Sequence, residues 1–127
     1  MSFLLDTHLI LWTSFRSRNL SEAARELLGK APGSCFSVAS LWEIAIKFAL
    51  GRPNFQIDPR VLRRGLLDNG YAELSVTADH VLATVVLPPI HKDPFDRLLV
   101  AQATVEGIVL LTADPTVARY PGPVRLV

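Results

Sequence analysis

Four acidic residues stand next to short apolar segments in an arrangement that suits metal chemistry. Asp6 and Asp114 each follow a short apolar run, and Glu43 and Asp96 stand where two helices are expected to begin. Carboxylate oxygens are ligands that Mg²⁺ and Mn²⁺ prefer, and both ions keep part of their water shell when bound. If the four carboxylates converge, they would hold a divalent cation that activates water and stabilises charge on a phosphate.

The apolar pattern predicts short strands that alternate with helices. Strands are expected at 3–5, 35–38, 72–76, 108–111 and 124–127, and helices at 7–15, 21–28, 41–50, 59–70, 77–87 and 95–106. This alternation predicts an α/β fold in one domain, 1–127, with a mostly parallel sheet of four to five strands sandwiched between helices. Ligands of such sheets bind beyond the carboxyl ends of the strands, where Asp6 and Asp114 are expected.

The expected helix beginnings give all four acids a favourable electrostatic setting. A helix N-terminus carries free N–H groups and about half a positive charge, which helps to keep a nearby carboxylate ionised. Four ionised carboxylates at one edge would repel one another unless a cation lay between them. The sequence therefore favours a cation site, provided that the fold brings the four acids together.

The same positions are also typical of helix caps. Ser40 and Glu43 have the spacing of a capping box. Asp93 precedes a proline and lies three residues before Asp96, as an N-cap would, and Asp114 is also followed by a proline. The cap and ligand interpretations do not exclude each other, and no local spacing shows that the acids converge.

Polar residues beside the acids have two interpretations each. Thr7 and Thr112 offer hydroxyls that would bond a ligand water or a carboxylate, or would cap the chain locally. Asp93 shares a helix face with Asp96, but capping explains it without chemistry. His91 would donate to a phosphate from beside the acids, or would be an ordinary loop residue.

Composition limits the class of protein. The chain has 127 residues, of which 50% are hydrophobic and 20% charged, with a formal net charge of +1. These values suit one domain with a buried core and exclude a disordered chain. Cys35 is the single cysteine, so no intramolecular disulfide and no cysteine-based metal site is expected. Neither a signal peptide nor a membrane-spanning run is recognisable, and we expect a cytoplasmic protein.

Four segments carry a wider resemblance. They are Leu4-Leu5-Asp6-Thr7-His8, Ser40-Leu41-Trp42-Glu43-Ile44-Ala45-Ile46-Lys47, His91-Lys92-Asp93-Pro94-Phe95-Asp96-Arg97-Leu98-Leu99-Val100-Ala101-Gln102-Ala103 and Leu110-Leu111-Thr112-Ala113-Asp114. In this order and at these intervals they resemble the PIN-domain toxins of the VapC type, which belong to VapBC toxin–antitoxin pairs. The resemblance covers nearly the whole chain, and the four segments together are highly specific.

The resemblance implies a parallel α/β/α sandwich and a metal-dependent endoribonuclease. Asp6, Glu43, Asp96 and Asp114 match the family's acidic cluster, which binds Mg²⁺ or Mn²⁺. Water would attack RNA and leave a 5′-phosphate and a 3′-hydroxyl. In our hypothesis Asp6 and Asp96 are the main ligands, Glu43 holds a metal or orients the water, and Asp114 completes the cluster. A VapB-like antitoxin and a homodimer are the implied protein partners.

Other side chains could serve the implied function or be structural. Lys47, four residues after Glu43, is expected to form a helical ion pair with it. Arg97 would face RNA phosphate or pair with a carboxylate. Trp12 and Trp42 are expected in the core, or in a hydrophobic groove for the antitoxin. A basic cluster would guide RNA or form a solvated helix face: Arg60, Arg63 and Arg64.

Two other classes of protein compete with this interpretation. A non-catalytic scaffold with the same fold would bind RNA or protein, and retention of all four acids argues against it. A phosphotransfer protein also uses an aspartate after its first strand. A haloacid-dehalogenase-like phosphatase would need a second aspartate where His8 stands, and a receiver domain would need a late lysine, whereas no lysine follows Lys92.

Overall fold

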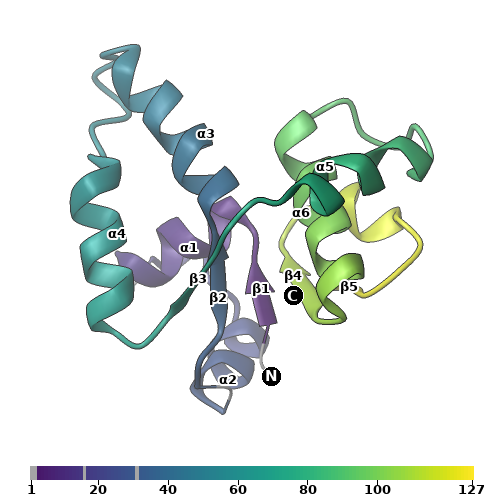
Figure 1. Cartoon of the computed structure of the whole chain (residues 1–127). Helices are drawn as coiled ribbons and strands as arrows, with labels where there is room; N and C mark the ends of the chain where they lie inside the picture. The colour runs from purple at the N-terminus through teal and green to yellow at the C-terminus, as the bar shows by residue number, and fades with distance from the viewer. Residues whose placement is uncertain (1–2, 16, 31) are drawn as a thin grey trace.

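The computed structural model describes residues 3–15, 17–30 and 32–127 (Figure 1). Its strands are β1 (Phe3–Leu5), β2 (Cys35–Ser37), β3 (Ala72–Leu74), β4 (Val109–Thr112) and β5 (Val124–Leu126). Its helices are α1 (Thr7–Ser14), α2 (Glu22–Gly29), α3 (Val38–Ala49), α4 (Pro59–Asp68), α5 (Ala78–Ala83) and α6 (Pro94–Glu106), with short 3₁₀ turns η1 (Thr84–Val86) and η2 (Val117–Arg119). Within these described residues, no helix has both the length and the apolar character needed to cross a membrane.

All strand pairs in the sheet are parallel, which confirms the predicted α/β fold. The strand order is β3-β2-β1-β4-β5. The chain therefore adds β2 and β3 on one side of β1, and then β4 and β5 on the other side. The order therefore reverses between β1 and β4. In open parallel sheets, a crevice for ligands forms outside the carboxyl ends of the strands at such a switch point. Leu5 pairs with Leu111 there, so β1 and β4 end side by side.

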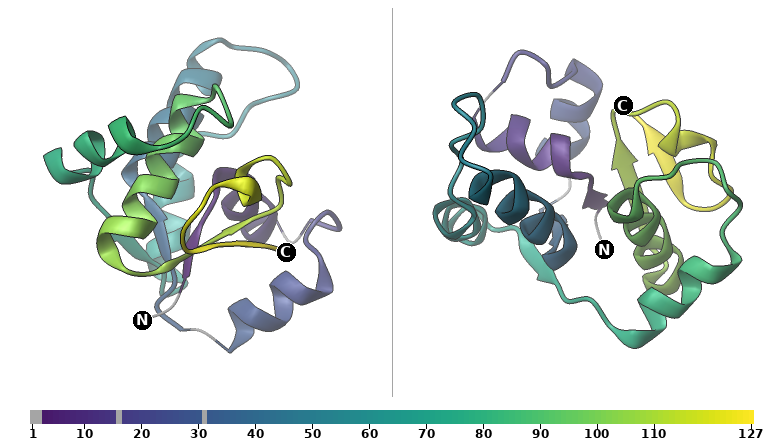
Figure 2. Two further views of the ribbon diagram at one scale, coloured as in Figure 1. Left: turned by 90° about the vertical axis from the view of Figure 1, so that its right-hand side faces the viewer. Right: turned by 90° about the horizontal axis from the view of Figure 1, so that it is seen from above.

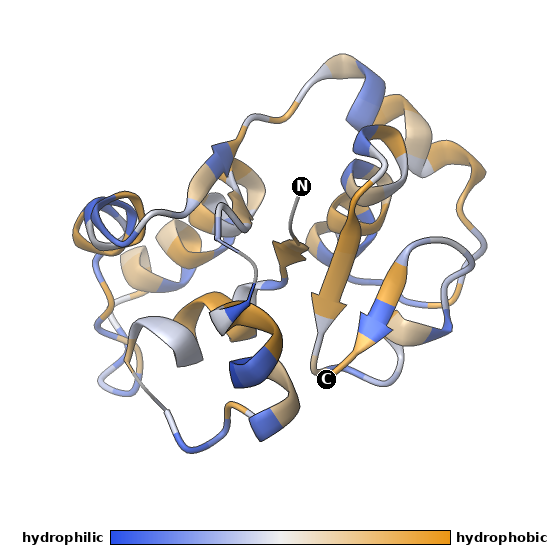
Figure 3. Ribbon diagram, turned by 90° about the horizontal axis from the view of Figure 1, so that it is seen from below, coloured by the Kyte–Doolittle hydropathy of each residue, from blue (hydrophilic) through white to orange (hydrophobic). Residues whose placement is uncertain are grey.

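Alternate residues of the inner strands face the two helical layers. Leu5, Phe36 and Leu111 pack into a core with α1, α2, α3 and α4. Leu4 and Leu110, one residue earlier in their strands, pack into a second core with α6 and η2. The view from above in Figure 2 shows α1 to α4 on one side of the sheet and α5 and α6 on the other. Figure 3 shows the hydrophobic colouring along most of β4, as expected for a strand covered on both faces.

Helix α3 begins earlier than the sequence predicted. Its N-cap is Ser37, at the end of β2, and the Ser37 hydroxyl accepts a hydrogen bond from Ala39 N at 3.0 Å. Ser40 is buried inside the helix, so the predicted capping box of Ser40 and Glu43 is wrong. Glu43 lies in the second helical turn and does not benefit from the free N–H groups of the first. The strand runs directly into the helix, and the serine at that junction becomes the cap.

The predicted helix at 77–87 is also shorter than expected. Thr77 caps α5, but the α-helix ends at Ala83 and continues as the 3₁₀ turn η1. The predicted strand at 72–76 ends at Leu74. Trp12 packs against the first core, as expected. The prediction that Trp42 is a core residue is wrong, because its side chain is 62% exposed.

Candidate active site

Asp6 is held rigidly where β1 ends and α1 begins. Its Oδ1 accepts a hydrogen bond from Leu9 N at 2.9 Å, which makes it the N-cap of α1. Its Oδ2 accepts from the Thr112 hydroxyl at 2.7 Å and from Ala113 N at 3.2 Å. The residue is only 3% exposed, and this burial raises the pKa of the Asp6 carboxyl, while the hydrogen bonds act in the opposite direction. Asp6 is thus both a cap and a fixed group at the switch point.

Glu43 is oriented by two neighbours from different helices. Thr7, the first residue of α1, donates to Glu43 Oε1 at 2.7 Å and also lies 3.0 Å from the Ser40 hydroxyl. Lys47 Nζ lies 3.2 Å from Glu43 Oε2, which confirms the predicted helical ion pair. The Glu43 side chain is 12% exposed. One carboxylate oxygen is therefore tied to α1, the helix that Asp6 caps.

Asp96 lies in the first turn of α6, as predicted. Asp93 is the N-cap of this helix, and its Oδ1 accepts from Phe95 N at 2.8 Å and from Asp96 N at 3.4 Å. Burial, with smaller contributions from the negative charges of Asp93, Glu43 and Asp6, raises the pKa of Asp96 to about 7, while His91 acts in the opposite direction. Asp96 is thus close enough to Glu43 and Asp6 to interact with their charges.

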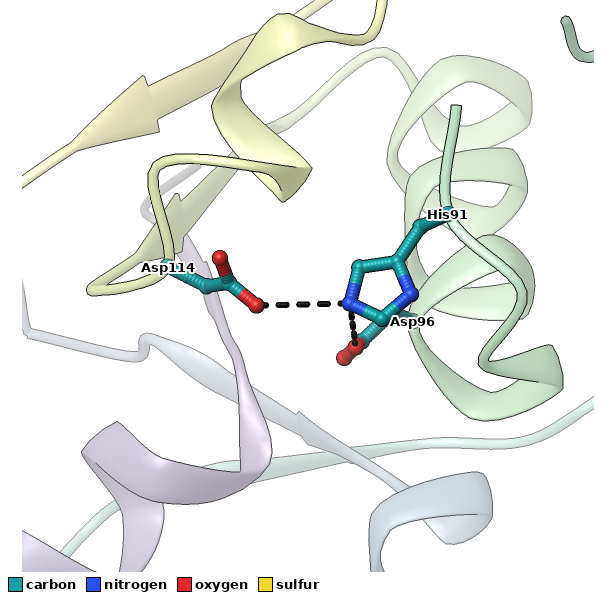
Figure 4. Close-up of side chains that lie close together, drawn as sticks. All are labelled: His91, Asp96 and Asp114. Atoms are coloured by element: carbon teal, nitrogen blue, oxygen red, sulfur yellow. Dashed lines mark ion pairs between the residues drawn. The ribbon is translucent and has the colours of Figure 1, made fainter. Parts of the chain in front are cut away.

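His91 lies beside Asp96, and both face Asp114 across a short gap (Figure 4). Asp114 N donates to the Thr112 hydroxyl at 3.0 Å, and Asp114 Oδ1 accepts from Thr116 N at 2.8 Å. His91 Nε2 lies 3.4 Å from Asp114 Oδ2 and 3.5 Å from Asp96 Oδ2. One potential ligand atom from each of these three residues lies within 4.8 Å of the other two. His91 therefore stands between two of the predicted acids.

The surroundings of His91 indicate that its ring donates a hydrogen bond toward the acids. Its Nδ1 accepts from Asp93 N at 3.1 Å, so in the neutral ring the proton is on Nε2. The Tyr120 hydroxyl accepts from His91 N at 2.9 Å and donates to His91 O at 3.2 Å. Nε2 then presents an N–H group to the carboxylates, and no lone pair is available there for a metal. His91 is placed to orient carboxylates, and its predicted contact with phosphate stays a prediction.

Arg97 does not take part in the cluster. Its guanidinium donates to three main-chain carbonyls and to the Tyr120 hydroxyl, at 2.9 to 3.3 Å. These carbonyls belong to Thr84, Leu87 and Pro88, so Arg97 fastens η1 and the following turn to α6. The prediction that Arg97 faces phosphate or pairs with a carboxylate is therefore wrong.

The basic residues of α4 are largely paired with local acids. Arg60 Nη2 lies 2.8 Å from Asp58 Oδ2, and Arg63 forms a bidentate ion pair with Glu73. These arginines are exposed, and their pairing agrees with the solvated helix face that was the alternative to RNA guidance.

A buried polar link between two helices was not predicted. Gln102 on α6 is fully buried, accepts from the Ser37 hydroxyl at 2.6 Å and donates to Ser75 O at 3.3 Å. The Ser37 cap of α3 is thereby tied to α6, so the helices that carry Glu43 and Asp96 are joined. An amide inside the apolar stretch 98–103 is the signal that could have indicated this link.

The residues present fit a hard divalent cation. The donors are carboxylate oxygens, with threonine hydroxyls bonded to two of them. Burial is the main cause of the raised pKa of Asp96, and the repulsion from neighbouring carboxylates that adds to it would be relieved by a positive ion between them.

Comparison with known proteins agrees with this architecture. The model of the PIN domain family matches residues 3–123, whereas no curated protein matches the sequence. VapBC2 from Rickettsia felis, in a structure with a promoter DNA fragment, superposes with a TM-score of 0.73 at 16% identity, over 99% of this chain and 98% of that one. A toxin–antitoxin complex from Klebsiella pneumoniae gives 0.69 at 20% identity, over 98% and 96%. DNA-bound VapBC from Salmonella typhimurium gives 0.67 at 18% identity, over 100% and 97%. The family match covers almost the entire chain, and the protein belongs to the PIN domain family.

Proposed function

We propose that this protein is the VapC-like toxin of a type II toxin–antitoxin pair and cleaves RNA as a metal-dependent endoribonuclease. The observation that carries the proposal is the position of Asp96. It interacts electrostatically with Glu43 and Asp6 and lies across His91 from Asp114. The four acids come from four segments of the chain, and the hydrogen bonds of Thr7 and Thr112 and the contacts of His91 support their convergence near the switch point of the sheet. Helix capping requires one side-chain acceptor at each helix start and does not require acids from different segments to approach one another.

The proposed mechanism assigns each acid a role. Asp6, Glu43, Asp96 and Asp114 would hold Mg²⁺ or Mn²⁺, with Asp6 and Asp96 as the main ligands. When bound, the cation supplies an activated water and offsets charge on the scissile phosphate. Glu43, whose Oε1 is fixed by Thr7, would orient the attacking water. Cleavage would leave a 5′-phosphate and a 3′-hydroxyl on the RNA.

The test is cleavage of total RNA by the purified, antitoxin-free protein with Mg²⁺ or Mn²⁺, and with EDTA. The Asp6→Asn/Asp96→Asn double variant should be inactive while it remains folded. Asp79→Asn removes an exposed acid in the first turn of α5 and serves as the matched control, which should keep full activity. Ligation that requires a 5′-phosphate would identify the product ends. Cleavage by the double variant would contradict the assigned site or reveal a contaminant, whereas no cleavage by the folded, metal-loaded protein would contradict the enzyme and favour the binding scaffold.

An antitoxin segment would cover the groove between α1 and α4. This groove has a volume of about 700 Å³ and is lined in part by Phe15, Ile57, Val61 and Tyr71. Phe15 and Val61 are 60% and 67% exposed. Exposed apolar surface of this extent favours a protein partner. Val61→Asp should weaken retention of a VapB-like protein co-expressed with the toxin.

A second exposed apolar surface supports the proposed homodimer. It runs along α5 and η1 and consists of Val81, Leu82, Val85 and Val86. These side chains repeat at helical spacing and would be covered by a second copy. Val85→Asp should shift the sedimentation coefficient to that of a monomer.

The proposed RNA target lies in the cytoplasm, where the free thiol of Cys35 would stay reduced.

A further inference from the structure

Two aromatic side chains, each one residue before a proposed ligand, meet between α3 and α6. Trp42 on α3 and Phe95 on α6 form an edge-to-face pair with ring centroids 5.3 Å apart and an interplanar angle of 75°. Trp42 is nevertheless 62% exposed. Burial of an indole ring is favourable, because it removes a large apolar surface from water. An exposed tryptophan whose ring is fixed by a second aromatic ring therefore suggests that a ligand covers it.

The pair is continuous with the candidate active site. Trp42 directly precedes Glu43 on α3, and Phe95 directly precedes Asp96 on α6. The main chain of Phe95 is fixed because its N–H donates to Asp93 Oδ1 at 2.8 Å. The aromatic pair is therefore built by the residues that directly precede two of the proposed ligands. Lys92, three residues before Phe95, is exposed and adds positive charge on this side.

We propose that the indole of Trp42, supported by Phe95, is a stacking platform for an unpaired nucleobase next to the scissile phosphate. This inference rests on the proposed ribonuclease function and narrows its substrate to single-stranded or looped RNA. Every base has a π-face, and aromatic side chains bind unpaired bases by stacking, with little dependence on sequence. Bases inside a duplex are already stacked and cannot occupy such a platform.

A protein partner on this face is the alternative. Trp42 belongs to an exposed apolar stripe on α3, with members four residues apart: Val38, Trp42, Ile46 and Leu50. A second copy of the chain could use such a stripe. A base is favoured because Trp42 and Phe95 form an aromatic pair and each directly precedes one of the proposed ligands in the sequence. The stripe also provides the control, since Ile46 lies one helical turn farther along.

The test measures binding without cleavage, in an Asp6→Asn background with Mg²⁺ present. The probes are a short fluorescent single-stranded RNA of mixed sequence, the same RNA with abasic positions, and its duplex. Trp42→Ala should weaken binding of the single strand about tenfold to a hundredfold, which is the range expected for one lost stacked base. Trp42→Phe should keep most of the affinity, and Ile46→Ala should keep all of it. The abasic strand and the duplex should bind to the wild-type surface as weakly as the single strand binds to Trp42→Ala.

Several outcomes would overturn the inference. If the Trp42→Ala variant and its parent bind RNA equally while the unmodified chain cleaves RNA, the stacking platform is refuted and the nuclease function stands. An equal loss in Ile46→Ala, together with a lower sedimentation coefficient in both variants, assigns the stripe to a protein interface. Absence of both cleavage and RNA binding removes the proposed function together with the platform. Thermal unfolding of each variant shows that a loss of binding is not a loss of fold.

Discussion

The hydroxyl of Thr112 lies 2.7 Å from Oδ2 of Asp6, although the two residues are 106 positions apart. The same hydroxyl accepts from Asp114 N at 3.0 Å. One side chain thus fixes the ends of β1 and β4 and links two of the proposed ligands. Threonine at this position is a support for the acids, which is one of the two interpretations that the sequence allowed.

Thr112→Val should weaken both the proposed metal site and the fold. Valine keeps the shape but leaves Asp6 Oδ2 with one donor fewer, so we expect about tenfold to a hundredfold weaker binding of Mn²⁺ by calorimetry. Loss of this buried hydrogen bond should lower the free energy of unfolding by about 1–3 kcal/mol. Thr104→Val is the matched control, because the Thr104 hydroxyl bonds only to Val100 O among the contacts described for α6. Unchanged metal affinity in Thr112→Val would contradict the supporting role.

Asp96 should make the metal-free protein less stable as the pH rises. The pKa of its carboxyl is raised from 3.8 to about 7 in the folded chain, so the folded state binds this proton more tightly than the unfolded state does. The contribution is fully present below about pH 4 and is lost as the pH rises through about 7. Asp96→Asn should therefore stabilise the metal-free protein by about 4 kcal/mol at pH well above 7 and have little effect below about pH 4.

Urea unfolding in EDTA at about pH 5 and about pH 8 measures this difference. The slope that remains in Asp96→Asn reports other groups, including Asp6, whose pKa is also raised by burial. Added Mg²⁺ should stabilise the parent protein at the higher pH and stabilise the variant less. Identical pH slopes in the two proteins would show that the fold does not raise the pKa of Asp96.

The sequence predicted the sheet and the two acids at its edge because those signals are local. Strand length, helix period and the place of Asp6 and Asp114 can be recognised within short windows. The order of the strands and the convergence of the acids depend on contacts such as that between Thr112 and Asp6, which no window contains.

The start of α3 shows why one site residue was misplaced along its helix. Ser37 and Ser40 are equally good caps by residue type, and the spacing to Glu43 favoured Ser40. Tertiary contacts decide between them. Ser37 donates to the buried Gln102 of α6 at 2.6 Å, whereas the Ser40 hydroxyl lies 3.0 Å from that of Thr7. Both partners are far away in the sequence, so a local pattern cannot include them.

Arg97→Met should lower stability without altering the contact with RNA phosphates. The side chain donates to the carbonyls of Thr84, Leu87 and Pro88, and hydrogen bonds from charged groups are stronger than neutral ones. We expect the free energy of unfolding to fall by about 3 kcal/mol. The salt dependence of RNA binding should be unchanged, since a lost phosphate contact would reduce its slope by about one unit. Arg64→Met, on the exposed face of α4, is the control for loss of a charge and should leave stability unchanged.

His91 and Tyr120 provide the last prediction, which concerns the tautomer of the ring. Since Nδ1 accepts from Asp93 N, nitrogen NMR of the unmodified protein should show the proton of His91 on Nε2. Tyr120→Phe removes the hydroxyl that holds His91 N and O, and should give a mixture of tautomers and slower cleavage. His91→Gln can still present an N–H group to Asp96 and Asp114, so it should retain more activity than His91→Leu. A proton on Nδ1 would contradict the predicted tautomer, and an Nε2 signal displaced by a bound diamagnetic metal would instead identify His91 as a ligand. The three residues within 4.8 Å of one another would then form a metal site, with the other acids outside it.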